Sequence, residues 1–412
     1  KSGRQAAWEG FSGKLEKAFD RPLEQVLKGE ISDSVVAFSK VLDALELDEG
    51  IREKWAQAYG NIANAMAGEL RIGEEQLPGL NDCRKVIVSG MGWSGSGAVY
   101  DYLSEFHKVV PIKGETPYIE AERTLKSIYG NLDDSQKLNR SLLEFFFYAV
   151  LGYAKFRSKD DCKLFQYARR KAENNIEEFS DVLLEFSLFA AHLICADDDD
   201  GRINAFKKLS TFVVNELSIR RKIRKDEVAL LDNAVHIYNI RCLEFLDDTT
   251  IICTFRDPRS NWVARVREAP FADSANQFSK KAEAIKQYIS QVDAYSQKYP
   301  FPNKKSVKRI AFEDFVLSEE FRDEIATQIG LNLSERDKYS CFKAWESAPN
   351  VFLHQEYENQ GDIRIIEDAM SEYCYDLPPI EEVSITKPPE GKKAEENDSR
   401  RRSFWQRIFH KP

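Results

Sequence analysis

The stretch that decides the fold is Arg84-Lys-Val-Ile-Val-Ser-Gly-Met-Gly-Trp-Ser-Gly-Ser-Gly97. It opens with a short, β-branched apolar run, which is typical of a buried strand in a parallel sheet. Four glycines follow between Ser89 and Gly97, and Ala98–Phe106 then has the pattern of a helix. Glycines let a backbone approach an anion closely, and a helix N-terminus offers unpaired N–H groups. The stretch therefore predicts a strand, a phosphate-binding loop and a helix.

Three more apolar runs have the character of strands: Val109–Ile112, Thr250–Phe255 and Val307–Phe312. A strand–helix–strand order implies a right-handed crossover and a parallel sheet. Almost everything else has helical patterning. We therefore predict an α/β fold with a small central parallel sheet, a P-loop-like phosphate loop and many flanking helices.

The predicted organisation has three parts. A helical N-terminal segment covers residues 1–80, and one α/β domain covers 81–385. Within that domain, residues 119–230 are predicted to be a helical insert that could form an acceptor cleft. Residues 386–412 are predicted to be a disordered linker and a basic amphipathic tail, because 378–399 is rich in Pro, Glu, Lys and Ser.

Composition excludes several classes of protein. The net charge of -9 speaks against nucleic acid as the main partner. The seven cysteines form no CxxC pair, which favours reduced thiols in a cytoplasmic compartment, and the five scattered histidines predict no metal site. No apolar run is long enough to span a membrane, and the N-terminus has no signal-peptide pattern.

The glycine loop alone leaves several interpretations open. A Walker A loop would need a lysine, and Ser96-Gly97-Ala98 has none. Gly90-x-Gly92-x-x-Gly95 fits the dinucleotide fingerprint, with Glu115 following 20 residues later where a ribose-binding acid would lie. A tight turn without any ligand is the third possibility.

A second motif adds two arginines. The run from Thr250 to Phe255 ends in Arg256-Asp-Pro-Arg259, at the carboxyl end of a predicted strand. Ligands of open α/β sheets bind at this edge. If this strand neighbours the first, Arg256 would lie beside the glycine loop and could bind a phosphate in bidentate fashion. The alternative is a surface ion pair between Arg256 and Asp257.

Together, the segments 86–97 and 251–260 resemble the two donor-binding motifs of sulfotransferases that use PAPS, 3'-phosphoadenosine 5'-phosphosulfate. In that family the first loop holds the 5'-phosphosulfate and the second motif holds the 3'-phosphate. Residues 230–234, 309–316 and 342–351 resemble further family segments in the expected order.

The resemblance implies a donor site and marks two departures. It assigns donor contacts to Gly92, Trp93, Ser94, Gly95, Ser96, Gly97, Arg256, Arg259, Ser347 and Asn350. Trp93 stands where the family usually has Lys or Arg. Ala264 stands where it usually has a Ser that contacts the 3'-phosphate.

The function that the resemblance implies is transfer of a sulfuryl group from PAPS, without a metal, to a hydroxyl. The expected acceptor is a saccharide of a cell-surface glycan or glycolipid. In the glycan-modifying branch a Glu follows the second strand, which makes Glu115 the expected general base; His107 is the other candidate. The alternatives are an NAD(P)-binding oxidoreductase and a nucleotide-binding module without catalysis.

The C-terminal tail carries a separate prediction. Phe404, Trp405, Ile408 and Phe409 would share one face of a helix, and five basic residues between Arg400 and Lys411 would line the rest. Such a segment is typical of an interfacial anchor. It predicts a cytoplasmic protein held peripherally at the anionic inner face of a membrane. The alternative is docking on the acidic body of the same protein or of a partner.

Overall fold

The computed structural model describes residues 38–39, 42–43, 47–80, 83–112, 118–150, 175–219, 223–269 and 273–379. They belong to two compact units, which we describe separately. The helical unit takes its described residues from 1–83, 114–225 and 241–249, and the sheet unit takes them from 84–113, 226–240 and 250–412.

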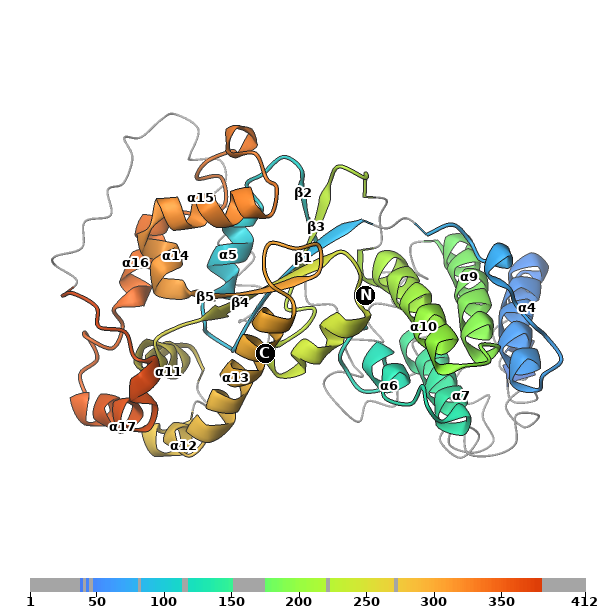
Figure 1. Cartoon of the computed structure of the whole chain (residues 1–412), viewed down its shortest axis with the longest axis horizontal. Helices are drawn as coiled ribbons and strands as arrows, with labels where there is room; N and C mark the ends of the chain where they lie inside the picture. The colour runs from blue at the N-terminus through green and yellow to red at the C-terminus, as the bar shows by residue number, and fades with distance from the viewer. Residues whose placement is uncertain are drawn as a thin grey trace. The chain divides into compact units, whose positions relative to one another are not determined.

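The sheet unit is built on five strands (Figure 1). They are β1 Arg84–Gly90, β2 Val109–Ile112, β3 Val228–Asp232, β4 Thr249–Phe255 and β5 Ser306–Ala311, in the order β2-β3-β1-β4-β5. The pairs β1–β3, β2–β3 and β4–β5 are parallel. This confirms the predicted α/β fold with a small central parallel sheet. β1 is the middle strand, so the loop that follows it begins at the centre of the sheet.

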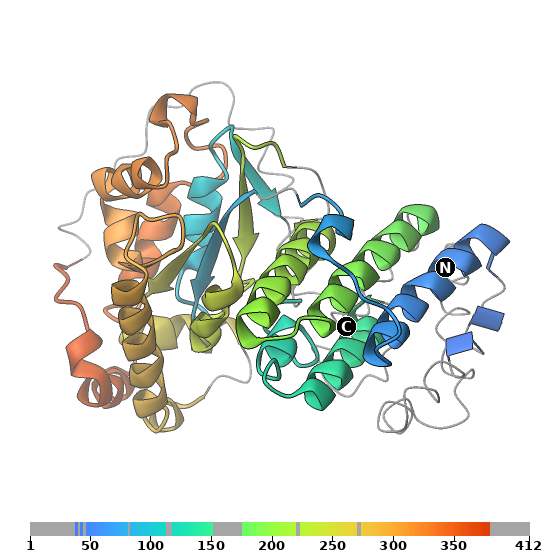
Figure 2. The same ribbon diagram turned by 45° about the vertical axis from the view of Figure 1, so that its right-hand side comes forward.

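Helices surround these strands, and Figure 2 shows α5 lying against them. The helices are α5 Ser96–Leu103, α11 Pro258–Glu268, α12 Ala275–Ser279, α13 Ala282–Lys298, α14 Phe312–Leu317, α15 Glu319–Gln328, α16 Ala344–Val351 and α17 Gln360–Met370, with the short η5 Leu333–Glu335 and η6 Ser371–Tyr373. Val86 and Val88 of β1 pack with Tyr102 of α5 and Phe315 of α14 in a buried core. The alternate residue Ile87 is also buried. Both faces of β1 are therefore covered, as the continuous apolar run Val86–Val88 requires.

The prediction of a helical insert over 119–230 is wrong at its end. Val228–Asp232 forms β3, which lies between β1 and β2. Its first four residues are buried because neighbouring strands bond to both of its edges. The residues Val-Ala-Leu-Leu have no strong strand propensity of their own, and the pairing with β1 and β2 overrides it.

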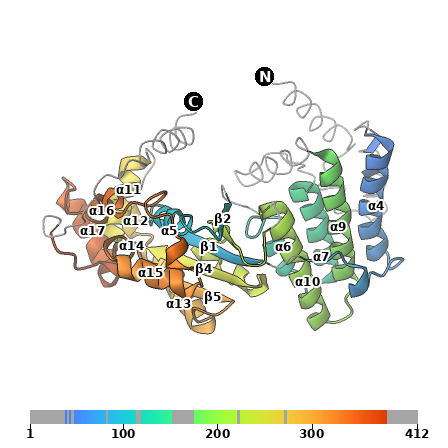
Figure 3. The same ribbon diagram turned by 90° about the horizontal axis from the view of Figure 1, so that it is seen from above.

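The helical unit comprises α4 Glu49–Met66, α6 Leu125–Tyr129, α7 Ser135–Glu144, α9 Ile176–Ile194 and α10 Asp199–Val213, with η1 Glu74–Gln76, η2 Phe145–Val150 and η3 Val214–Ile219. The segment η4 Ile237–Phe245 runs from the sheet unit into it. Helix α4 lies beside α9 (Figure 3), and Trp55 donates to the Ser180 hydroxyl across 2.8 Å. The N-terminal helix therefore packs on the insert within one unit.

Several predicted features lie outside the described residues: the helices expected before residue 38, Glu115 and the tail 386–412. Among the helices that are described, none combines the length and the apolar character needed to cross a bilayer.

Candidate functional site

The glycine loop lies where the order of the strands reverses. From β1 the chain crosses to the outer strand β2 and returns through β3, whereas β4 and β5 lie on the other side of β1. In open α/β sheets, ligands bind outside the carboxyl ends of the strands at such a switch point. The loop Met91–Gly95, which connects β1 to the N-terminus of α5, occupies this place.

The four glycines of the loop divide into two kinds. Gly95 has a φ of 86°, and a Cβ there would clash with the ring of Phe312, whereas a Cβ on Gly90 would clash with the Ser94 hydroxyl. Packing of the chain itself therefore requires these two glycines. Gly92 and Gly97 are exposed, and a Cβ on either would meet nothing within 4 Å. At these two positions the backbone is open to an approaching group.

Arg256 follows β4 directly and reaches the glycine loop, as the sequence predicted for neighbouring strands. Its Nη1 donates to the carbonyl of Trp93 across 3.3 Å. Three residues into α11, the Asn261 side-chain amide donates to the carbonyl of Gly92 across 3.1 Å. The residues after β4 thus hold the loop from one side.

Arg256 is only 9% exposed, yet its Nε and Nη2 have no hydrogen-bond partner. The guanidinium lies over the ring of Phe312, at 5.0 Å from the ring centroid. Burial lowers the pKa of Arg256 to about 10. A buried cation with unmade hydrogen bonds is costly, and a bound anion would supply the missing acceptors. The buried Ser94 hydroxyl in the same loop also lacks a partner.

The side chain of Trp93 contacts an acidic and a basic residue of α11. Its φ is 65°, and its indole N–H donates to Glu268 near the end of α11 across 2.8 Å. The guanidinium of Arg265 lies 5.3 Å from the centroid of the indole ring. Arg265 therefore places a positive charge beside Trp93, the position at which the sulfotransferases that the sequence resembles usually have Lys or Arg.

Arg259 is committed to contacts within the protein. It donates to both carboxylate oxygens of the fully buried Asp257, to Glu367 and to the carbonyl of Tyr375. Asp257 also accepts the backbone N–H of Tyr375 across 2.9 Å. This ion pair fastens the segment after η6 to the corner between β4 and α11.

The two C-terminal candidates, Ser347 and Asn350, lie on α16. The partly buried Ala348 and the buried Val351 of this helix belong to a cluster that includes Phe312 and, at its margin, Ala98 of α5. Ser347 is half-buried and Asn350 is exposed. The helix that bears them thus packs beside the first turn of α5, although within the described residues neither is hydrogen-bonded to the loop.

Glu313 was not among the predicted site residues. It is 1% exposed, accepts the backbone N–H of Asp257 across 2.9 Å, and leaves its Oε2 without a partner. Burial raises its pKa to about 7, and the charges of Asp257 and Arg256 act on it in opposite directions. Its signal in the sequence was the Phe-Glu-Asp run at the end of a predicted strand.

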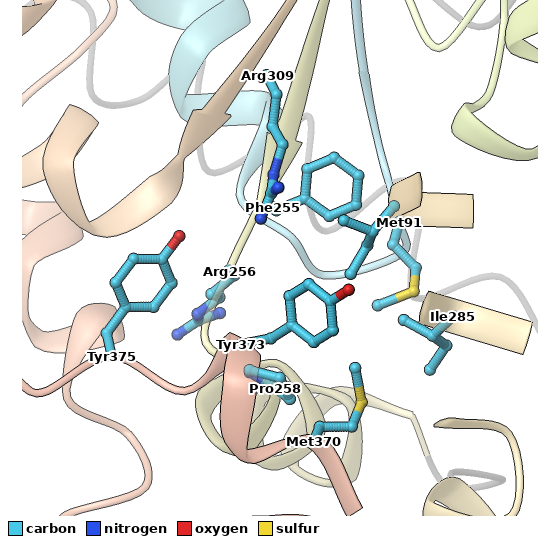
Figure 4. Close-up of a pocket in the computed structure, with 10 residues that line it drawn as sticks. Met91, Phe255, Arg256, Pro258, Ile285, Arg309, Met370, Tyr373 and Tyr375 are labelled. Atoms are coloured by element: carbon cyan, nitrogen blue, oxygen red, sulfur yellow. The ribbon is translucent and has the colours of Figure 1, made fainter. Parts of the chain in front are cut away.

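A cavity of about 20 Å³ adjoins Arg256, which is room for about one water molecule. Figure 4 shows Arg256 with Tyr373 and Tyr375 on either side of it in that view. The lining residues are Met91, Phe255, Arg256, Pro258, Ile285, Ile289, Arg309, Met370, Tyr373 and Tyr375. Arg309 is already paired with Asp293, 3.0 Å away.

His107 lies at the opposite edge of the sheet. It precedes Val109, and both Val109 and Arg84 are in register with Val228 at the amino end of β3. β1 runs six residues further before the glycine loop, so the two edges are about 20 Å apart. The structure does not bring His107 to the loop, and Glu115 lies outside the described residues.

Within the described ranges, no three His, Cys, Asp or Glu side chains gather closely enough to hold a metal ion. Comparisons with family models, with curated proteins and with solved structures found no match to this chain.

Proposed function

We propose that the sheet unit binds PAPS and transfers its sulfuryl group to a hydroxyl of a saccharide. The observation that carries this proposal is Arg256, buried beside the glycine loop with two unpartnered guanidinium nitrogens. The resemblance required a strand-end arginine to meet a strand-end glycine loop, and β1 and β4 are neighbours in the sheet.

The residues present fit the two anionic ends of this donor. Arg256 would hold the 3'-phosphate, and the exposed backbone at Gly92 and Gly97, with the N-terminus of α5, would hold the 5'-phosphosulfate. When bound, PAPS supplies the sulfuryl group that the acceptor oxygen attacks.

The chain contributes position and charge. Transfer of a compact anionic group depends mainly on in-line positioning and electrostatic stabilisation. Arg256 and the loop N–H groups orient the donor, and Arg265 beside Trp93 adds positive charge near the loop. The acceptor hydroxyl must give its proton to a base. Glu115 keeps this role as a prediction of the resemblance, and His107 is about 20 Å from the loop.

The second candidate, an NAD(P)-binding oxidoreductase, is less well supported. In the usual dinucleotide-binding order, β2 neighbours β1, which brings the acid after β2 to the ribose. Here β3 lies between them, so the carboxyl end of β2 is about 10 Å from that of β1. A nucleotide-binding module without catalysis would share the donor site and differ only in turnover.

The direct test measures binding of PAP, ATP and NAD to the purified protein by calorimetry. We expect PAP to bind and Arg256→Ala to weaken it by about 10- to 150-fold, the value of a charge-assisted hydrogen bond. Arg309→Ala is the matched control, because that guanidinium lines the same cavity but is already paired with Asp293. Binding of NAD but not PAP would refute the proposal, as would an unchanged PAP affinity in a folded Arg256→Ala protein.

We further propose that residues 400–412 hold the protein peripherally at the anionic inner face of a membrane, from the cytoplasmic side. The basic and aromatic residues of this tail support the proposal. Deleting residues 400–412 should abolish sedimentation with vesicles that contain phosphatidylserine and leave PAP binding unchanged. Equal sedimentation of the shortened protein would exclude this anchor.

A further inference from the structure

The turn that opens the glycine loop has a tryptophan at a position that favours glycine. The N–H of Ser94 donates to the carbonyl of Met91 across 2.9 Å, which closes a tight turn. Its third residue, Trp93, has a φ of 65°, whereas Gly92 before it has no left-handed φ. This is the pattern of a type II turn, whose third position favours glycine because other side chains strain the left-handed conformation. A strained residue persists where its surroundings hold it, so the contacts of this side chain matter.

The side chain of Trp93 is held by one face of α11. Its indole N–H donates to Glu268 across 2.8 Å, and the guanidinium of Arg265 lies 5.3 Å from the centroid of its ring. These two residues are three positions apart, so they are neighbours on the helix surface. Arg265 also contacts Phe278 of α12, at 5.8 Å from the ring centroid, which fixes the guanidinium against a second aromatic ring.

The backbone of the same turn is held by the same part of the chain. Asn261 of α11 donates to the carbonyl of Gly92, and Arg256, two residues before α11, donates to the carbonyl of Trp93. The C=O and N–H of a trans peptide point in opposite directions. The bond from Asn261 therefore turns the N–H of Trp93 away from α11, and among the described residues this N–H has no acceptor.

We propose that Trp93 is a positioning residue: its indole, held by Glu268 and Arg265, keeps the turn Met91–Ser94 in the conformation that receives an anionic group of the donor. This inference rests on the proposed function. Backbone N–H groups that are oriented in advance bind an anion without the cost of ordering the loop at that moment. The indole itself touches α11 and not the donor.

Glu268 favours donor binding through its hydrogen bond and opposes it through its charge. Burial lowers the pKa of Arg256, and the charge of Glu268 partly opposes this shift, so the carboxylate acts on the same site as the donor. A negative charge there repels a second anion. A glutamine at this position keeps an acceptor for the indole N–H of Trp93 and removes the charge, which separates the two effects.

The first experiment measures PAP binding by calorimetry in proteins whose folding is checked by circular dichroism. Trp93→Gly removes the side chain but leaves the residue that the turn favours, and we expect it to weaken PAP binding about fivefold or more. Trp93→Phe keeps a ring beside Arg265 and loses the indole donor, so its affinity should be intermediate. Trp262→Phe is the matched control, because it removes another indole donor of α11, bonded to the carbonyl of Asp273, and should leave PAP affinity unchanged.

The second experiment tests the hydrogen bond itself. We expect Glu268→Gln to bind PAP at least as tightly as wild type and Glu268→Ala to bind it more weakly than Glu268→Gln. This difference should disappear when Trp93→Gly is also present, because the two residues act as one unit. Normal PAP affinity in Trp93→Gly, or a difference between the two Glu268 variants that persists beside Trp93→Gly, overturns this inference and leaves the donor site intact. A wild-type protein that binds no PAP overturns the proposed function and this inference with it.

Discussion

A buried ion pair at the amino edge of the sheet and two buried charged side chains at its carboxyl edge differ in how completely their polar atoms are bonded. At the amino edge, Glu105 and Arg336 have 0% and 2% exposed side chains and are joined at 2.7 Å. The other oxygen of Glu105 accepts the N–H groups of Cys341 and Phe342. At the carboxyl edge, the buried side chains of Arg256 and Glu313 both retain unpartnered atoms.

This difference is the one expected if the carboxyl edge holds the proposed donor site. Folding stability favours charge networks whose members are all satisfied, because an unpaired buried polar group costs free energy. Unpartnered atoms of Arg256, Glu313 and Ser94 concentrate where a ligand would complete them. At the amino edge Arg84 leaves only its Nε without a partner, so the unpartnered groups at the carboxyl edge agree with the proposed donor site there.

The largest effect should come from breaking the satisfied edge. Glu105→Ala removes the fully buried carboxylate partner of Arg336, leaves it only the longer contact with Asp323 at 3.4 Å, and should lower the free energy of unfolding by about 3–5 kcal/mol. Urea unfolding followed by circular dichroism measures this loss. Glu319→Ala is the control, because its ion pair with Lys338 is about half exposed and should contribute no more than about 1 kcal/mol. Equal losses in the two variants would contradict the comparison.

An intermediate effect should appear at the carboxyl edge as a dependence on pH. Burial raises the pKa of Glu313 to about 7. A carboxyl whose pKa is higher in the folded state binds more protons when folded, so its contribution to stability is present at low pH and is lost as pH rises toward about 7. The stability of wild type relative to Glu313→Gln should fall by roughly 3 kcal/mol between pH 4.5 and pH 8. Parallel stability curves for the two proteins would show that Glu313 does not titrate in this range.

The smallest effect should separate the two kinds of glycine within the loop. Gly95→Ala forces a side chain into a left-handed conformation and toward Phe312, which should cost about 1–3 kcal/mol of stability. Gly97→Ala meets open space, so it should change stability by less than about 0.5 kcal/mol while weakening PAP binding. Thermal unfolding and calorimetry of both variants test this. A stable Gly95→Ala protein, or normal PAP affinity in Gly97→Ala, would remove the distinction.

Sequence patterns predicted the strands that have their own apolar, β-branched runs. β1 begins at Arg84, where the predicted strand opens, and β2, β4 and β5 all lie within one residue of their predicted limits. β3 was missed because Val-Ala-Leu-Leu suits a helix as well as a strand, and only pairing with two neighbours decides between them. The position of β3 between β1 and β2 is likewise a long-range property that no local pattern contains.

The part of the candidate site that lies at the carboxyl ends of β1 and β4 could be predicted from the sequence. Arg256 reaches the loop because β4 neighbours β1, which the sequence predicted only as a condition. The engagement of Arg259 by Glu367 and Tyr375 was not predictable, because these partners lie more than 100 residues away along the chain. The position of His107 already follows from the predicted parallel topology, because a residue just before the second strand of such a unit lies at the amino edge, opposite the loop that follows the first strand.

Gly95 packs against Phe312, a residue that is far away along the chain, so this contact forms late during synthesis. The ribosome delivers the glycine loop more than 200 residues before Phe312, and β1 gains its neighbours β3 and β4 only after residues 228–255 have emerged. Pairing over such separations is slow. A nascent chain therefore carries β1 without its neighbouring strands for much of its translation, and this strand is exposed to aggregation and to chaperone binding before the sheet closes.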